Sequence, residues 1–327
     1  MDDILASGVT PMDFEQAGAR LQDARDAIGQ VFIGQEKVVE EVLATLLAGG
    51  HGLIVGVPGL GKTLLVETVA TVFGLSTRRI QFTPDLMPAD ILGSEVLEED
   101  ASGKRAFRFL EGPVFCQLLM ADEINRASPR TQSALLQAMQ ERQVAVGGLN
   151  RDLPKPFHVL ATQNPIEQEG AYPLPEAQLD RFLMEIRVDF PTLDTERRIL
   201  AATTGARAAA ASAALTAAEL MQAQASVRAM PIGEAVIEGI LRMVRAARPG
   251  AADSPLPAGA VAWGPGPRAS QALALAARAR ALLDGRLAPS LDDVIDLAPA
   301  VLRHRMALSY AAEIDQGLNI DTAISRL

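Results

Sequence analysis

The sequence predicts an α/β fold in two parts: a three-layer αβα domain around a parallel five-stranded sheet, followed by a smaller all-α domain. Short apolar segments alternate with segments of helical periodicity as far as Pro191, which is typical of βα units and a parallel sheet. Beyond Pro191 helical periodicity dominates. Residues 1–191 and 192–327 are therefore predicted as the two domains.

The predicted elements follow the chain in a regular order. Residues 11–30 and 36–47 carry apolar positions at helical spacing and predict two leading helices. Two more helices are expected at residues 64–73 and 128–140. The apolar runs predicted as strands are residues 53–55, 79–82, 118–123, 157–162 and 184–188. The second domain is predicted to contain helices at residues 215–230, 233–247, 268–283 and 290–303, with a flexible Gly/Pro-rich connection at residues 249–267.

Composition limits the function classes. Hydrophobic residues make up 49% of the chain and aromatic residues only 4%, so the apolar content is mainly aliphatic and favours helices. Charges and prolines interrupt each apolar stretch, so no membrane-spanning helix is expected. The net charge of −10 argues against a broad nucleic-acid surface. The single cysteine, Cys116, suits a reducing compartment, and its thiol is expected to be buried and inert. Together with the lack of a secretory signal pattern, it indicates a cytoplasmic location.

The run from Gly56 to Thr63 reads G-x-x-x-x-G-K-T and lies between a predicted strand and a predicted helix. Glycines let backbone N–H groups close around phosphates, and a helix N-terminus adds favourable partial charge. The run therefore predicts a nucleotide phosphate site, in which Lys62 reaches the β- and γ-phosphates and the Thr63 hydroxyl holds Mg²⁺. A chance glycine turn is the alternative, and the presence of both Lys and Thr disfavours it. The predicted nucleotide contacts are Gln35, Gly56, Pro58, Gly59, Leu60, Gly61, Lys62, Thr63 and Leu64.

The apolar run at residues 118–123 ends in two carboxylates, Asp122 and Glu123. A buried parallel strand delivers both of them to the carboxyl edge of the sheet, beside the phosphate loop. We expect Asp122 to support the Mg²⁺ shell and Glu123 to polarise the attacking water. The alternative is an ordinary helix cap after a strand, a role that Asn125 and Ser128 also suit.

Asn164 follows the strand predicted at residues 157–162, at the same edge of the sheet. This position lets its side chain orient a water molecule near the γ-phosphate. The alternative is that Asn164 only starts a turn before Pro165, since Asn side chains favour turns.

Two segments exceed a minimal nucleotide-binding fold. Residues 83–112 read as an insertion, with a hairpin that turns at residues 101–103. Residues 143–154 contain a second hairpin candidate with a Gly147-Gly148 turn.

Taken together, these features resemble AAA+ ATPases, and among them the MoxR family, over nearly the whole chain. The phosphate loop, the acidic pair, the Asn164 segment and Leu179-Asp180-Arg181-Phe182 occur in the order of AAA+ proteins. The insertions fit as well, because this branch carries an insert within its second helix and a hairpin before the sensor strand. The segments similar to the MoxR family are Gly112-Pro113-Val114-Phe115, Ala121-Asp122-Glu123-Ile124-Asn125-Arg126-Ala127, Thr131-Gln132-Ser133-Ala134-Leu135-Leu136, Pro175-Glu176-Ala177-Gln178-Leu179-Asp180-Arg181-Phe182 and Pro267-Arg268-Ala269-Ser270.

The resemblance implies roles for three further residues. Asn164 takes the sensor 1 role, and Arg268 takes the sensor 2 role, contacting phosphate from the lid of the same subunit. Arg181 takes the arginine-finger role on the nucleotide of the neighbouring subunit, where an Arg contributes about 10³–10⁵ in rate. The alternatives are a salt bridge of Arg181 with Asp180 or Glu185, and a solvent-exposed position for Arg268 at the start of a helix.

The resemblance also implies an ATP hydrolase that works as a homo-oligomeric ring, with a hexamer as the expected assembly. The work it implies is chaperone-like remodelling or maturation of partner proteins and enzyme complexes. A partner with a von Willebrand factor A domain is common in such systems. The expected function is therefore Mg-ATP hydrolysis coupled to remodelling of a protein client, with the two hairpins as candidate contacts.

One alternative is a nucleic-acid-acting AAA+ motor, because related branches with the same inserts translocate nucleic acid. A DNA-tracking hairpin should present basic tips. Here Lys104 and Arg105 follow three acidic residues, and the second hairpin carries only Arg151. This mixed charge disfavours the nucleic-acid hypothesis.

Two further alternatives are a metal-chelatase motor subunit and a nucleotide-gated scaffold. For the chelatase, His51, His158 and His304 are scattered along the chain, so a bound metal would have to belong to a partner or client. A scaffold that binds ATP but hardly hydrolyses it is disfavoured by the presence of Lys62 and Glu123.

Overall fold

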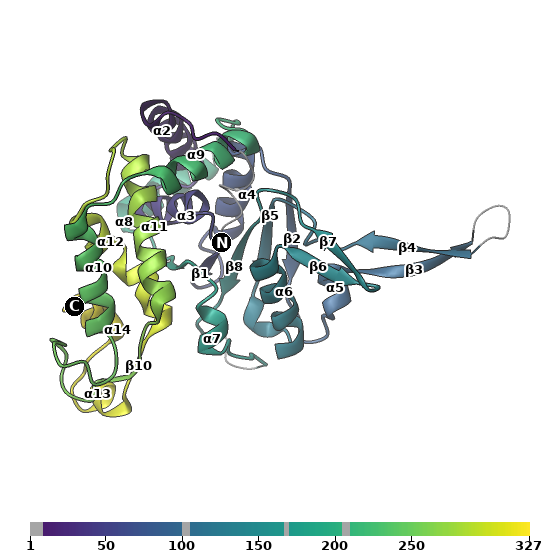
Figure 1. The fold of residues 1–327 in the computed structure, drawn as a ribbon. Coiled ribbons are helices and arrows are strands. Elements are labelled where there is room, and N and C mark those ends of the chain that lie inside the picture. Colours follow the sequence, from purple (N-terminus) through teal and green to yellow (C-terminus); the bar gives the residue numbers. More distant parts are fainter. Residues whose placement is uncertain (1–8, 100–104, 167–169, 205–209) are drawn as a thin grey trace.

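The computed structural model describes residues 9–99, 105–166, 170–204 and 210–327 (Figure 1). Its central sheet has five parallel strands in the order β2-β5-β8-β1-β9. The predicted α/β fold class and the five predicted strands are confirmed. The strands are β1 (Gly52–Val55), β2 (Thr77–Gln81), β5 (Leu118–Asp122), β8 (His158–Gln163) and β9 (Met184–Arg187).

Helices cover both faces of the sheet. Alternate residues of β5 face different hydrophobic clusters, because side chains along a strand point to opposite faces. Leu118 and Met120 pack in a cluster shared with helices before and after β1, whereas Leu119 and Ala121 pack in a second cluster beneath α6. The helices of this domain are α2 (Phe14–Val31), α3 (Glu36–Leu47), α4 (Lys62–Val72), α5 (Pro88–Leu92), α6 (Pro129–Glu141) and α7 (Glu176–Leu179), with the 3₁₀ turn η1 (Ile124–Arg126).

Both predicted hairpins are present as antiparallel pairs. The first consists of β3 (Gly93–Glu99) and β4 (Arg105–Glu111), and it projects away from the rest of the molecule (Figure 1). Its predicted turn at residues 101–103, and Lys104, lie outside the described residues. The second consists of β6 (Gln143–Val146) and β7 (Leu149–Asp152). Its turn residues Gly147 and Gly148 have φ values of 62° and 77°, which glycine adopts most readily.

The second domain is a helical lid, and each of its four predicted helices lies within two residues of the predicted bounds. The lid also contains a feature that the sequence did not indicate, because β10 and β11 pair as a short antiparallel ribbon. These strands are too short for an alternating pattern to identify them, and β10 lies inside the Gly/Pro-rich connection that was expected to be flexible. The lid elements are α8 (Leu193–Thr203), α9 (Ala217–Ala229), α10 (Glu234–Ala246), β10 (Val261–Trp263), α11 (Pro267–Leu283), α12 (Leu291–Leu302), η2 (Arg303–Arg305), β11 (Ala307–Leu308), α13 (Tyr310–Ile314) and α14 (Ile320–Ile324).

The lid and the αβα domain share one hydrophobic core. The cluster that contains α2, α3 and α4 continues without a break through α9 to α12. The position of the domain boundary near residue 191 stays a prediction. Within the described residues, no helix combines the length and apolar character needed to cross a membrane.

Candidate functional site

The phosphate loop joins the end of β1 to the start of α4. The N–H of Gly56 donates to the carbonyl of Gln163 at the end of β8 over 3.2 Å, which places the loop beside the segment that carries Asn164. A Cβ atom at Gly56 would lie 2.7 Å from the carbonyl oxygen of Val188. Gly59 and Gly61 have φ values of 84° and 77°. Glycine is therefore required at Gly56 by contact and favoured at the other two positions by backbone conformation.

Lys62 lies across this loop. Its ammonium group donates to the carbonyls of Gly56 and Val57 over 2.5 and 2.8 Å. Burial lowers the pKa of Lys62, and the nearby charges of Asp122 and Glu123 oppose that shift. Lys62 is therefore in the electrostatic range of the acidic pair. Helix α4 starts at Lys62 without a side-chain cap, so its first N–H groups remain available to an anion.

Asp122 is the last residue of β5 and is buried. One of its carboxylate oxygens accepts from the hydroxyl of Thr162 over 2.5 Å, and the other accepts from Arg79 over 2.5 Å. Neither partner was identified from the sequence, because each comes from a different strand and becomes a neighbour only through the strand order. Polar residues near the ends of β2 and β8 are the signal that could have indicated them.

Glu123 has a left-handed backbone, with φ 55° and ψ 51°. Its N–H donates to the hydroxyl of Thr162 over 2.9 Å. Its carboxylate accepts from Gln81 over 2.7 Å and from Arg126 over 3.1 Å. The helix-cap alternative does not apply to the acidic pair, because Ser128 caps α6 and the Glu123 side chain forms no cap bond. The Thr162 hydroxyl thus bonds both acidic residues, accepting from the Glu123 N–H and donating to the Asp122 carboxylate.

Asn164 is buried directly after β8. Its Oδ1 accepts from the N–H of Ile166 over 3.1 Å, which is the turn geometry of the simpler alternative. The next residue, Pro165, lines a cavity of about 290 Å³ together with Gly56 and Val57. Asn164 therefore supports a turn and also lies next to the phosphate loop, so the geometry permits both interpretations.

A larger cavity of about 470 Å³ adjoins the phosphate loop. Its lining is mainly apolar, and pockets of this size and character hold small ligands such as a nucleoside. Gln35 lines it and donates to the carbonyl of Asp189 over 3.4 Å. The lining residues that the sequence did not indicate include Phe32, Phe190, Ile199 and Leu200, from the α2–α3 connection and from the segment around α8.

Arg181 and Arg268 line a separate cavity of about 380 Å³. Arg181 precedes β9, whose first residue pairs with Gly52 at the start of β1, whereas the phosphate loop follows the end of β1. The two arginines are thus at the amino edge of the sheet. The role of Arg268 on phosphate in its own subunit stays a prediction. Helix α11 packs on α3 and α12, and Arg268 in its first turn lies 3.6 Å from the Asp180 carboxylate.

The carboxylates near Arg181 are paired with other residues. Asp180 pairs with Arg305 over 2.8 Å, and Glu185 pairs with Arg187 over 3.1 Å. The salt bridge considered for Arg181 is therefore not formed, and within the described ranges its guanidinium makes no ion pair. Arg268 lies at the start of α11 and its side chain is half exposed, which agrees with the alternative of a solvent-exposed position. Its guanidinium also lies near the Asp180 carboxylate.

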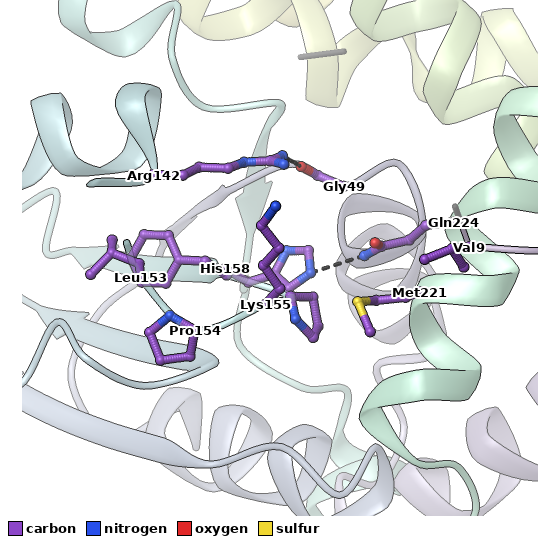
Figure 2. Close-up of a pocket in the computed structure, with 11 residues that line it drawn as sticks. Val9, Gly49, Arg142, Leu153, Pro154, Lys155, His158, Met221 and Gln224 are labelled. Atoms are coloured by element: carbon purple, nitrogen blue, oxygen red, sulfur yellow. Dashed lines mark hydrogen bonds between the residues drawn. The ribbon is translucent and has the colours of Figure 1, made fainter. Parts of the chain in front are cut away.

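The cavity drawn in Figure 2 is not a nucleotide site. Its volume is about 30 Å³, which is room for about one water molecule. It lies at the amino edge of the sheet beside His158, whose ring contacts Gln224. Burial lowers the pKa of His51 to about 3 and that of His158 to about 4, so both are neutral structural residues.

The described residues contain no group of three or more His, Cys, Asp or Glu side chains that could hold a metal ion. Any metal at the phosphate loop would therefore depend on one or two protein oxygens plus the ligand, which is how Mg²⁺ is usually bound.

Cys116 is buried, and this burial raises the pKa of its thiol to about 11, as expected for an inert cysteine.

A phosphate loop after β1, an acidic pair after β5 and an asparagine after β8, all at the carboxyl edge of one parallel sheet, define a P-loop nucleoside triphosphatase fold. The model of the ATPase family associated with various cellular activities (AAA) matches residues 51–184. The AAA lid domain model matches residues 256–326.

Known proteins match over most of the chain. The chaperone MoxR1 of Mycobacterium tuberculosis is 44% identical, over 90% of this chain and 78% of that protein. The protein MoxR of Paracoccus denitrificans is 33% identical, over 90% of this chain and 91% of that protein. The crystal structure of a candidate ATPase from Cytophaga hutchinsonii has a TM-score of 0.84 at 34% identity, covering 95% of both chains. The chain belongs to the MoxR family of AAA+ ATPases.

Proposed function

We propose that the chain is a cytoplasmic ATPase that hydrolyses Mg-ATP in a homo-oligomeric ring and uses the energy for chaperone-like remodelling of partner proteins. One observation carries this proposal. The chain presents a phosphate loop with an acidic pair at one edge of its sheet. At the other edge it presents a cavity lined by Arg181, which forms no ion pair with the part of the chain that the structure describes. Two such chains side by side could complete one shared site.

Within the site, the residues divide into binding and chemical roles. The oxygens of Thr63 and Asp122 fit Mg²⁺, which prefers hard oxygen ligands and keeps several waters. Lys62 would contact the β- and γ-phosphates, and the cavity beside Gln35 would receive the base. Glu123 would act as the general base on the attacking water, with Asn164 orienting that water.

Arg181 would act on the nucleotide of the neighbouring subunit. Because Arg268 lines the same cavity, we extend the trans role to it in place of the role within one subunit that the sequence indicated. Two guanidinium groups at one interface can stabilise the charge that develops on the transferred phosphoryl group. The family resemblance makes a hexamer the expected ring.

The surface of the first hairpin favours a protein as the client. Leu97 and Phe107 face each other across its strands and are 54% and 72% exposed, an apolar surface on a projecting arm. In the described parts of the two hairpins each arginine is paired with a carboxylate, so neither hairpin presents free positive charge for phosphates. The relative MoxR1 is named a chaperone, which agrees with a protein client. A partner with a von Willebrand factor A domain is proposed from the family resemblance alone.

The proposal is tested by ATP hydrolysis as a function of protein concentration, with light scattering on the same samples. Specific activity should rise as the assembly forms, because each site needs its neighbour. Activity that is independent of concentration in a confirmed monomer would contradict it. Stimulation by DNA at physiological salt would instead favour the nucleic-acid motor.

A further inference from the structure

Arg305 belongs to the lid turn η2 and is only 2% exposed. Its Nε donates to the carboxylate of Asp180 over 2.8 Å. Its two Nη atoms donate to the backbone carbonyls of Phe182 and Leu183, over 2.6 and 3.1 Å. A single planar guanidinium thus fixes chain positions on both sides of Arg181, in the fork geometry that only arginine offers.

The two preceding residues of η2 contact the same segment. Arg303 donates to the carbonyl of Glu185 over 3.3 Å, and Nε2 of His304 lies 3.1 Å from the carbonyl of Phe182. Burial keeps the pKa of His304 well below its ordinary value, so the ring is neutral and donates from Nε2. Three consecutive lid residues therefore hold residues 180–185 of the αβα domain.

The carboxylate of Asp180 is shared between two arginines. Arg305 holds Oδ1 from the protein interior, and Arg268 lies 3.6 Å from Oδ2 on the cavity side. If Asp180 paired with its neighbour Arg181 instead, it would cancel the charge that an arginine finger must bring to a phosphoryl group. The sharing keeps Asp180 occupied and Arg181 available.

We propose that Arg305 is a positioning residue for Arg181: it fixes the backbone that carries the finger and keeps Asp180 from neutralising it. The inference rests on the finger role of Arg181 in the proposed function. Because Arg305 belongs to the lid and Arg181 to the αβα domain, the position of the lid sets the position of the finger.

The test is a kinetic double-mutant cycle with Arg305→Lys and Arg181→Ala. Lysine keeps the charge but cannot bind a carboxylate and two carbonyls at once. In the wild-type background, Arg305→Lys should lower kcat by about 10- to 100-fold, the effect of displacing a catalytic group by about 1 Å. The Kd for a fluorescent ATP analogue should stay within about twofold, because the phosphate loop of the same chain is untouched. In the Arg181→Ala background, Arg305→Lys should cause no further loss.

The matched control is Arg286→Lys. Arg286 pairs with Asp293 over 2.6 Å within the same lid, and among the described residues its hydrogen bonds and ion pairs reach Asp284 and Asp293 rather than residues 180–185. Its substitution should leave kcat unchanged even if thermal stability falls. Equal loss of kcat from Arg305→Lys with and without Arg181 would overturn the positioning role, as would a parallel loss of ATP affinity.

A second variant covers the case in which Arg305→Lys folds poorly. Asp180→Ala removes the side-chain anchor that Nε of Arg305 holds, so the segment that carries Arg181 is less firmly fixed. It should also lower kcat without changing ATP affinity. The two proposals fail in different ways. If Arg181→Ala retains full activity, the finger role itself is wrong. If Arg181→Ala is strongly impaired and the Arg305 and Asp180 variants are normal, only the positioning role is wrong.

Discussion

Gln224 of α9 donates a hydrogen bond to Nε2 of His158 at the start of β8, over 3.0 Å (Figure 2). The same amide donates to the carbonyl of Leu46 over 2.8 Å, and Nδ1 of His158 lies 2.8 Å from the carbonyl of Gly50. Nδ1 therefore carries the proton and the imidazole is neutral. This contact joins a lid helix to the sheet at the edge opposite the phosphate loop.

The neutral state of His158 in this contact predicts how the free energy of unfolding depends on pH. The pKa of His158 is about 4 in the folded chain and 6.5 for a free histidine, so the unfolded chain takes up a proton first as pH falls. The contribution of His158 is complete above pH 6.5 and is lost between there and pH 4. His158→Gln should therefore reduce the slope of the unfolding free energy against pH, between about pH 6 and 5, by about 1 kcal/mol per pH unit.

Urea unfolding at several pH values measures this slope. His51 has a similar effect on the slope and Glu41 the opposite one, because burial raises the pKa of Glu41 to about 7. Both groups remain in the variant, so the difference from wild type isolates His158. An unchanged slope would show that folding does not lower the pKa of His158.

Lys62→Ala and Glu123→Gln should separate binding from chemistry. Lys62 lies across the phosphate loop, so its removal should abolish tight nucleotide binding. Glu123→Gln should bind ATP normally and reduce kcat by about 10²-fold or more, because the general base is lost. Titration with a fluorescent ATP analogue and phosphate release provide the two measurements. Equal loss of binding in both variants would contradict the separate roles.

Thr162→Val tests the link between the acidic residues. The Thr162 hydroxyl bonds both the Asp122 carboxylate and the Glu123 N–H, and valine keeps its shape without those bonds. We expect kcat to fall by about tenfold, equivalent to about 1.4 kcal/mol, because Glu123 is less well placed. Thr68→Val is the control, since the hydroxyl of Thr68 bonds only a helix carbonyl over 2.6 Å. Equal effects of both substitutions would assign the loss to general destabilisation.

Phe190→Ala tests the base cavity beside the phosphate loop. Phe190 lines that cavity and is 73% exposed, which leaves its ring available to a ligand. The Kd values for ATP and ADP should rise by a similar factor of about ten, because the contact is with the base and not the γ-phosphate. Phe107→Ala, on the projecting hairpin, should leave both Kd values unchanged. An effect on ATP alone would place Phe190 near the γ-phosphate instead.

The local parts of the candidate site could be named from the sequence. Lys62 and the acidic pair each depend on a short run and the strand or helix beside it, and the structure places them within electrostatic range of each other. Partners from other strands were missed: Arg79, Gln81 and Thr162 reach the acidic pair only because β2 and β8 flank β5, and no local pattern states that order. The position of Arg268 beside Asp180 was not indicated for a related reason, since the start of α11 is fixed by long-range packing of the lid.

The central claim is that one subunit supplies Arg181 to the site of the next. The most direct test mixes Arg181→Ala with Glu123→Gln, two variants that each retain only a small residual activity alone. In mixed rings some interfaces contain both an intact Glu123 and an intact Arg181, so ATP hydrolysis should recover in part. No recovery, although mixed assembly is demonstrated, would contradict the shared site.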